Sequence, residues 1–120
     1  MAKKDDLGRW GETVAVRHLE SVGMRIVDRN WRCREGEIDV VALDADELVV
    51  IEVKTRSSTA FGHPLEAVTR TKRDRLRRLA GLWLADHPGA SSSVRLDVVA
   101  VTGHLGSPAP EVQLVRGIDS

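Results

Sequence analysis

Residues 37–54 have the sequence EIDVVALDADELVVIEVK, which is the most strand-like segment of the chain. Two runs rich in Val, Ile and Leu flank a polar turn at residues 44–47, and this pattern predicts a β-hairpin. Asp39, Glu52 and Lys54 interrupt the apolar runs, at positions where a core strand would carry hydrophobic residues. Any interpretation of this hairpin therefore has to explain why two acids and a lysine interrupt its apolar runs.

The alternation of side chains along the two arms predicts the register of this hairpin. Alternate residues of a strand face opposite sides of a sheet. If the turn closes symmetrically about residues 45–46, Leu43 lies opposite Leu48 and Val41 lies opposite Val50. These four apolar side chains share one face, which is therefore expected to be largely buried.

The same register brings the charged residues together. It places Asp39 opposite Glu52, and Glu37 opposite Lys54, as an ion pair that would support the site by orienting the lysine. Directly opposed residues have Cβ atoms about 4.5–5.5 Å apart. Two carboxylates at that distance repel each other unless one is protonated or positive charge lies between them.

A hard divalent cation would satisfy such a pair of acids. Mg²⁺ takes oxygen ligands, tolerates one or two carboxylates and keeps several waters. Lys54 projects from the same face as Glu52, where it would align or help deprotonate a bound water, or neutralise charge that develops at a phosphate. The alternative is a solvated strand face on which Lys54 bridges the carboxylates. We favour the cation site, because the apolar neighbours place both acids at a core margin, where uncompensated like charges are costly.

Hydrophobic periodicity and turn signals predict the rest of the fold. The predicted elements are a helix at residues 7–22, strands at 24–34, 37–43 and 48–54, a loop at 55–64, a helix at 65–87, a strand at 94–102 and a short edge strand at 111–115. The order is α-β-β-β-α-β with a final β. We expect one α/β domain over residues 1–120, with its core at 7–102 and a C-terminal extension at 103–120 that ends in loosely held residues.

Composition is that of an ordinary globular domain: 42% of the 120 residues are hydrophobic and 30% are charged. The 18 basic and 18 acidic residues cancel, so the total charge neither supports nor excludes a nucleic-acid partner. Cys33 is the single cysteine, which excludes an internal disulfide and a cysteine-rich zinc site. No signal-peptide pattern and no apolar run of about 20 residues is present, so we expect a cytoplasmic protein without a membrane partner.

The predicted helix at residues 65–87 is strongly basic in its first half. Lys72 occupies its apolar stripe, where the side chain would extend along the core and place the ammonium near the end of the sheet. The residues predicted to contact phosphates are Lys72, Arg56, Arg70, Arg73 and Arg77. Such contacts are typical of nucleic-acid binding, although a charged helix face is also typical of simple solvation.

Two further features bear on function. Asp97 interrupts the apolar strand at residues 94–102, and we expect a structural role, capping or pairing with an arginine, rather than a third metal ligand. Aromatic residues make up only 3% of the chain, so stacking platforms for unpaired bases are scarce. A protein that recognises duplex or junction shape is therefore favoured over a single-strand binder.

An acid, a hairpin and then the tripeptide EVK at residues 52–54 resemble the signature of the PD-(D/E)XK nuclease superfamily, although Ile38 stands where the superfamily carries a proline. The wider series resembles the YraN-like family of small bacterial proteins, which are similar to archaeal Holliday junction resolvases. Its motifs are GRWGE at 8–12, NWRCREGEIDVVA at 30–42, VVIEVKTRSS at 49–58 and RLDVVAV at 95–101. The resemblance implies a restriction-endonuclease-like fold, in which a mixed sheet is flanked by helices.

The resemblance also implies roles for individual residues. Asp39 and Glu52 would bind Mg²⁺ or Mn²⁺ together with the carbonyl of Val53. Lys54 would position the attacking water at a scissile phosphate. Glu12, from the first helix, matches an acid that related resolvases bring to the metal site.

These observations predict a metal-dependent endonuclease that hydrolyses phosphodiester bonds in duplex or branched DNA. Two alternatives use the same fold: a nucleic-acid-binding module without cleavage, and a protein-interaction adaptor. Resolvases that resemble this chain act as dimers, because a four-way junction needs paired cuts. The resemblance therefore also implies a homodimer.

Overall fold

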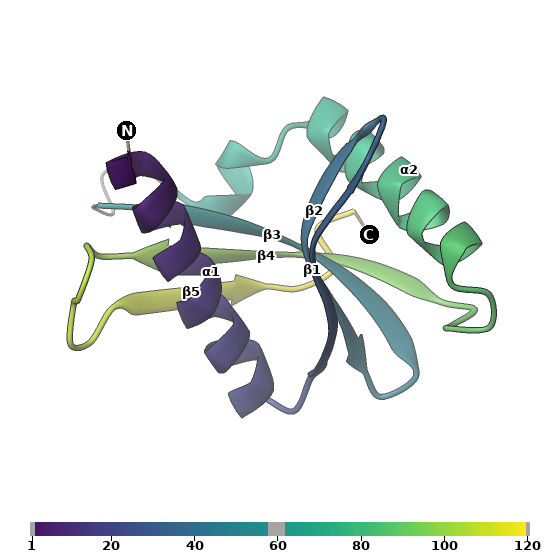
Figure 1. Ribbon diagram of the computed structural model, residues 1–120, viewed down its shortest axis with the longest axis horizontal. Helices are drawn as coiled ribbons and strands as arrows, with labels where there is room; N and C mark the ends of the chain where they lie inside the picture. The colour runs from purple at the N-terminus through teal and green to yellow at the C-terminus, as the bar shows by residue number, and fades with distance from the viewer. Residues whose placement is uncertain (1, 58–61, 120) are drawn as a thin grey trace.

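The computed structural model describes residues 2–57 and 62–119, and Figure 1 shows how its elements are arranged. The elements are helix α1 (Ala2–Ser21), strands β1 (Arg25–Cys33), β2 (Gly36–Asp44) and β3 (Glu47–Arg56), 3-10 helix η2 (Pro64–Ala67), helix α2 (Arg70–Asp86), and strands β4 (Val94–Thr102) and β5 (Glu111–Val115). This order confirms the predicted α-β-β-β-α-β succession with a final strand. Residues 58–61 of the predicted loop lie outside the described part of the chain.

The strands form one mixed sheet in the order β1-β2-β3-β4-β5. β1 to β3 pair antiparallel along the chain, β3 and β4 pair parallel, and β5 returns antiparallel to β4. Parallel neighbours need a crossover connection, which η2 and α2 supply. The predicted α/β class and mixed sheet are therefore confirmed. Among the helices of the described residues, none has the length and apolar character needed to cross a membrane.

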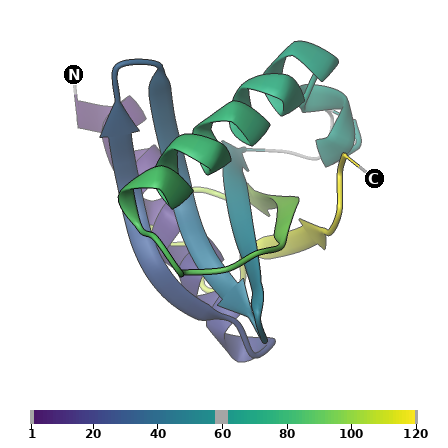
Figure 2. The same cartoon turned by 90° about the vertical axis from the view of Figure 1, so that its right-hand side faces the viewer.

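The two α-helices cover opposite faces of the sheet, as Figure 2 shows. On one face, Leu76, Leu79 and Trp83 of α2 are buried against side chains of β2, β3 and β4. On the other face, Ala15 and Leu19 of α1 are buried against the alternate residues of the same strands. Full burial of a large apolar side chain stabilises a fold by about 1.5–3 kcal/mol, so these two cores hold the helices on the sheet.

The predicted hairpin register is confirmed in its apolar part. Leu43 pairs with Leu48 and Val41 pairs with Val50. The turn between the arms contains Ala45 with a φ of 55°, a left-handed conformation that suits a two-residue hairpin turn.

The alternation of β2 is interrupted at Asp39. Ile38 packs in the core under α2, whereas Val40 packs in the core under α1, although residues two apart on a strand normally share a face. The β1 residue between the flanking pairs is Asn30, whose φ of 53° is left-handed. The regular pairing of β2 with β3 ends at Val40 and Ile51, so Asp39 lies just beyond it.

The prediction of one continuous helix at residues 65–87 is wrong in its first turns. A 3-10 helix occupies Pro64–Ala67, and α2 begins after Thr69, whose side chain accepts a hydrogen bond from the N–H of Lys72. A threonine in this position is a typical helix N-cap. Val68, which precedes the cap, is buried in the core under α2 and therefore keeps the apolar spacing that suggested a helix.

The prediction of a loosely held C-terminus is also wrong for the residues that the structure describes, which end at Asp119. Ile118 is 5% exposed, and its N–H donates to the carbonyl of Leu96 on β4. Arg73 donates to the carbonyl of Ile118, and Arg77 forms an ion pair with Asp119. The C-terminal extension thus supplies a strand to the sheet and a side chain to the core.

Candidate functional site

A pocket of about 210 Å³ lies between the sheet and α2. It is lined by Glu37, Asp39, Glu52, Lys72, Arg75, Leu76 and Leu79. The acids come from β2 and β3, whereas the basic residues come from α2, so one wall is acidic and the other is basic. The structure thus brings together the two predicted metal ligands and the predicted phosphate contact Lys72.

The carboxyl group of Asp39 is partly buried and weakly compensated. Its Oδ2 accepts a 2.9 Å hydrogen bond from the backbone N–H of Val53. Burial raises the pKa of Asp39 to about 7, and the charge of Glu52 is the next cause. The more distant charges of Glu12 and Glu37 also raise this pKa, whereas the bond from Val53 lowers it. A cation beside Asp39 would favour its ionised form.

Two lysines meet beside the pocket. The Nζ of Lys54 lies 3.0 Å from Oε2 of Glu52, and the two side chains are only 29% and 19% exposed. Burial lowers the pKa of Lys54, but contact with Lys72 and the charge of Glu52 outweigh it, so the pKa is raised. Contact with Lys54 lowers the pKa of Lys72. Lys54 is therefore a protonated cation held against Glu52.

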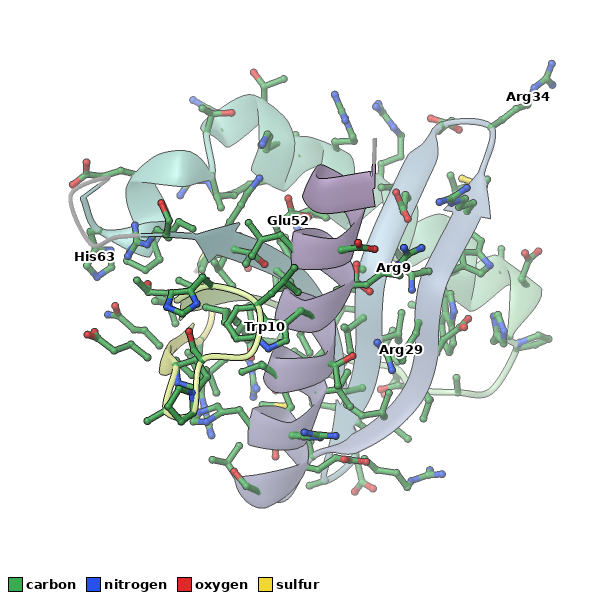
Figure 3. The ribbon with its side chains drawn as sticks, turned by 60° about the vertical axis from the view of Figure 1, so that its left-hand side comes forward. Arg9, Trp10, Arg29, Arg34, Glu52 and His63 are labelled. Atoms are coloured by element: carbon green, nitrogen blue, oxygen red, sulfur yellow. The ribbon has the colours of Figure 1, made fainter. Side chains whose placement is uncertain are left out.

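Glu12 lies on α1 and lines a second hollow, next to Asn30, rather than the pocket of the acid pair. Its Oε1 lies 4.0 Å from the guanidinium of Arg29, and its side chain is 16% exposed. Burial raises the pKa of Glu12, against a hydrogen bond with Asn30 and the charge of Arg29. Figure 3 shows Arg29 beside α1 on the side of the β1–β2 hairpin. Glu12 thus approaches Asp39 from the face opposite α2, close enough to influence its pKa.

Glu37 does not form the predicted ion pair with Lys54. Its Oε2 lies 3.4 Å from Nε of Arg32, while Lys54 pairs with Glu52. The interruption at Asp39 explains the difference, because the regular register does not extend to Glu37. Glu37 borders both the pocket and a second hollow of about 470 Å³ on the α1 side, so its supporting role in the site stays a prediction.

Arg75 belongs to the basic run of the predicted helix but was not singled out as a phosphate contact, although it lines the pocket. Lys72, Arg75 and Leu79 follow the i, i+3, i+7 spacing of one helical face. Counting this spacing from Lys72 would have identified Arg75 as a second basic residue that faces the pocket.

The other predicted phosphate contacts lie outside the pocket. Arg73 and Arg77 bind the C-terminal segment, and Arg70 borders a separate hollow beside it. Arg56, at the end of β3, donates a 2.6 Å hydrogen bond to the carbonyl of Gly62. The structure therefore gives several of these arginines structural partners, and their contact with nucleic acid stays a prediction.

Asp97 has the structural role that was predicted. Its carboxylate oxygens each accept a 2.9 Å hydrogen bond from Arg95, and the N–H of Gly117 donates another at 3.0 Å. Arg95 also lies 3.0 Å from Asp44. This network ties the start of β4 to the hairpin turn and to the C-terminal segment.

The residues of the pocket fit a hard divalent cation. Asp39 and Glu52 offer carboxylate oxygens, the ligands that Mg²⁺ takes in proteins, and two carboxylates completed by waters are a common magnesium site. Within residues 2–57 and 62–119, no group of three or more His, Cys, Asp and Glu side chains is gathered as a metal cage. The fit therefore rests on the acid pair and on the burial that raises the pKa of Asp39.

The fold and the site define a small α/β domain in which a pocket with one acidic and one basic wall lies between a mixed sheet and its crossover helix. The chain belongs to the uncharacterised protein family UPF0102, whose sequence profile matches residues 11–101. This membership confirms the predicted YraN-like family.

Full-length relatives carry the same family name. A UPF0102 protein of Arthrobacter sp. (strain FB24) is 58% identical over 118 residues, which cover 98% of this chain and 99% of the relative. A UPF0102 protein of Kineococcus radiotolerans is 61% identical over 116 residues, covering 96% of this chain and 94% of the relative. A third relative, from Frankia alni, is 61% identical over 117 residues, covering 98% and 97%.

Proposed function

We propose that this chain is a metal-dependent endonuclease that hydrolyses phosphodiester bonds in duplex or branched DNA. The observation that carries the proposal is the pair Asp39 and Glu52 in one pocket, with Lys54 ion-paired to Glu52. Perturbed acids in a pocket are typical of functional sites. The basic wall opposite them is suited to a phosphate.

The arrangement of elements supports the same proposal. The α1-β1-β2-β3-α2-β4 succession, with acids on the second and third strands, is the one implied by resemblance to the PD-(D/E)XK nucleases. We therefore propose that the sheet and helices are a restriction-endonuclease-like core, to which β5 adds an edge strand.

The proposed roles follow from the surroundings of each side chain. Asp39 and Glu52 would hold Mg²⁺ or Mn²⁺, with the carbonyl of Val53 as a further ligand and Glu12 approaching from α1. When bound, such a metal lowers the pKa of a water and stabilises charge on the phosphate. Lys54 would act as a cation that orients the water and the phosphate, because its pKa is raised.

Hydrolysis would proceed by attack of water on phosphorus. A bond forms between the water oxygen and phosphorus, the water gives up a proton to solvent, one ester P–O bond breaks, and the leaving oxygen takes up a proton from solvent to become a hydroxyl group. Lys72 and Arg75, on the wall opposite the acids, would stabilise the charge that develops on the phosphate oxygens.

The test is cleavage of labelled duplexes, forks and four-way junctions with Mg²⁺ or Mn²⁺. Asp39→Ala and Lys54→Ala should each lower the cleavage rate by about 100-fold or more, since the first would remove a ligand of the metal and the second a cation beside the reacting phosphate. Asp46→Ala is the matched control, because Asp46 is exposed in the turn of the same hairpin. Equal cleavage by the wild type and both site variants would reject the proposal.

A binding module without cleavage is the second candidate, and the basic residues of α2 favour it. Lys72 and Arg75 would contact the backbone of DNA whether or not the metal supports turnover. This candidate predicts salt-sensitive binding that is unchanged by EDTA and yields no product. Absence of DNA binding at low salt would leave a protein-interaction adaptor.

A further inference from the structure

A close contact between α1 and β3 lies directly beside the proposed site. Gly11 of α1 is buried, and a Cβ added to it would lie 2.8 Å from Cγ2 and 2.9 Å from Cβ of Thr55, and closer still to Oγ1. Ordinary carbon contacts begin at about 3.4 Å. Rotation of the Thr55 side chain moves Oγ1 and Cγ2 but not Cβ, so no rotamer of Thr55 makes room for a methyl group on Gly11.

The residues of α1 that face the sheet increase in size along the helix. Gly11, Ala15 and Leu19 follow each other at intervals of four, and all three are buried. Such residues lie on one face of a helix, and the smallest side chain allows the closest approach to the sheet. α1 therefore approaches the sheet most closely at Gly11.

This point of approach coincides with the end of β3 that carries the proposed site. Thr55 follows Lys54, and alternation places it with Val53 on the face of α1, while Lys54 and Glu52 lie on the other face. Glu12, the residue after Gly11, is the acid that α1 contributes.

We propose that Gly11 is a positioning residue, whose contact with Thr55 sets α1 close enough to β3 for Glu12 to reach the cation held by Asp39 and Glu52. This inference rests on the proposed function, because it concerns the same metal. Glu12 lines the hollow on the α1 side together with Glu37, which also borders the pocket of the acid pair, so only a short distance separates Glu12 from that pocket. A methyl group at Gly11 would displace this part of α1, and Glu12 would be carried away from the acid pair.

The first test compares Gly11→Ala with Gly8→Ala in the same helix. A Cβ on Gly8 meets nothing within 4 Å, so Gly8→Ala should raise Tm slightly, as alanine normally does in a helix. Gly11→Ala should lower Tm instead. In the Gly11→Ala background, Thr55→Ala should partly restore Tm. Thr55→Gly also removes the Cβ and should restore Tm more fully. Each gain is measured after subtracting the change in Tm that the same Thr55 substitution causes in the wild type.

The second test measures Mn²⁺ affinity by calorimetry. Gly11→Ala should weaken binding about 10-fold, as is typical when a residue that orients a metal ligand is lost, whereas Gly8→Ala should leave it unchanged. Glu12→Gln should weaken binding in the wild type but add no further loss in the Gly11→Ala background. This non-additivity distinguishes positioning of Glu12 from a general loss of structure.

The outcomes separate this inference from the proposed function. If the wild type binds no Mn²⁺, both fail. If the wild type binds Mn²⁺ but Gly11→Ala binds it equally well, or if Gly11→Ala and Glu12→Gln are simply additive, the positioning role is overturned while the nuclease proposal stands. Should Gly11→Ala fail to fold, Glu12→Asp shortens the reach by one methylene without touching Thr55, and unchanged Mn²⁺ affinity in that variant would also overturn the inference.

Discussion

Asp97 and Asp39 are two acids of one sheet with opposite surroundings. Asp97 is fully buried, yet its carboxylate accepts two hydrogen bonds from Arg95 and one from the N–H of Gly117. Asp39 accepts one hydrogen bond, from Val53, and other acids raise its pKa further. The chain thus pairs one aspartate directly with an arginine, whereas burial and neighbouring acids raise the pKa of the other.

The contrast separates an acid that holds the fold from one that the proposed function assigns to a metal site. A polar residue inside an apolar strand is compatible with either role, since buried charges are tolerated when they are paired. The surroundings decide between the two roles. An acid that lacks opposite charge raises the free energy of the metal-free protein, and a bound cation removes that cost.

Asp97→Asn should have the largest effect on stability. Removing one charge of a buried pair costs about 3–5 kcal/mol, because the partner is left uncompensated. We expect the free energy of unfolding in urea to fall by this amount, with or without Mn²⁺. Asp6→Asn breaks an exposed pair with Arg9 (side chains 43% and 73% exposed) and should cost about 0.5 kcal/mol or less. If both variants lost the same free energy of unfolding, Asp97 would contribute no more to stability than an exposed acid does.

Mn²⁺ should stabilise the wild type and leave Asp39→Asn unaffected. A ligand that binds only the folded state adds about 2.7 kcal/mol at 100 times its Kd, which would raise Tm by several degrees. Tm is compared in EDTA and in Mn²⁺ at one pH. Asp97→Asn, if folded, should keep the full Mn²⁺ shift, because its acid takes no part in binding. A Mn²⁺ shift in Asp39→Asn as large as in the wild type would place the cation elsewhere.

Asp39→Asn should stabilise the metal-free protein, by about 1–2 kcal/mol at pH 8, because the amide oxygen can still accept from Val53 without carrying charge. The pKa of Asp39 is raised from 3.8 to about 7 in the folded state. Between about pH 4 and pH 7, the folded state therefore keeps a proton on Asp39 that the unfolded state has lost. The wild type should therefore lose stability as pH rises from about 4 to 7, and the difference between the proteins should grow over that range. Unfolding in EDTA at pH 4, 6 and 8 measures it, and a constant difference would contradict the prediction.

Much of the fold follows from local pattern. The two apolar runs of the hairpin determine its register. The strand predicted at 94–102 coincides with β4 because most of its residues are apolar, although Arg95 and Asp97 interrupt them. The start of α2 was mispredicted because Val68 keeps helical spacing outside the helix, where it packs in the core. Docking of Ile118 was missed because one apolar residue between Gly117 and Asp119 carries no periodic signal.

The site was predicted where strand parity applies and missed where it does not. Asp39 and Glu52 line one pocket just beyond the last regular pair of the hairpin, and Lys54 is ion-paired to Glu52. Glu37 pairs with Arg32 because the alternation changes at Asp39, and no local residue pattern announces this change. Partners that depend on the packing of α2 against the sheet require the tertiary structure.

The smallest expected effect concerns Lys72, which repeats the contrast among basic residues. Arg77 is compensated by Asp119, whereas Lys72 faces Lys54, which lowers its pKa. If Lys72 contacts a phosphate, Lys72→Gln should reduce the slope of log affinity against log salt for duplex DNA by about 0.9, the value for one released counterion. Arg34→Gln removes the same charge at the tip of the β1–β2 hairpin, where the side chain points to solvent (Figure 3), and should leave the slope unchanged. Equal slopes for Lys72→Gln and the wild type would show that Lys72 contacts no phosphate. Of the two basic residues that line the pocket, Arg75 would then be the one left to bind a phosphate.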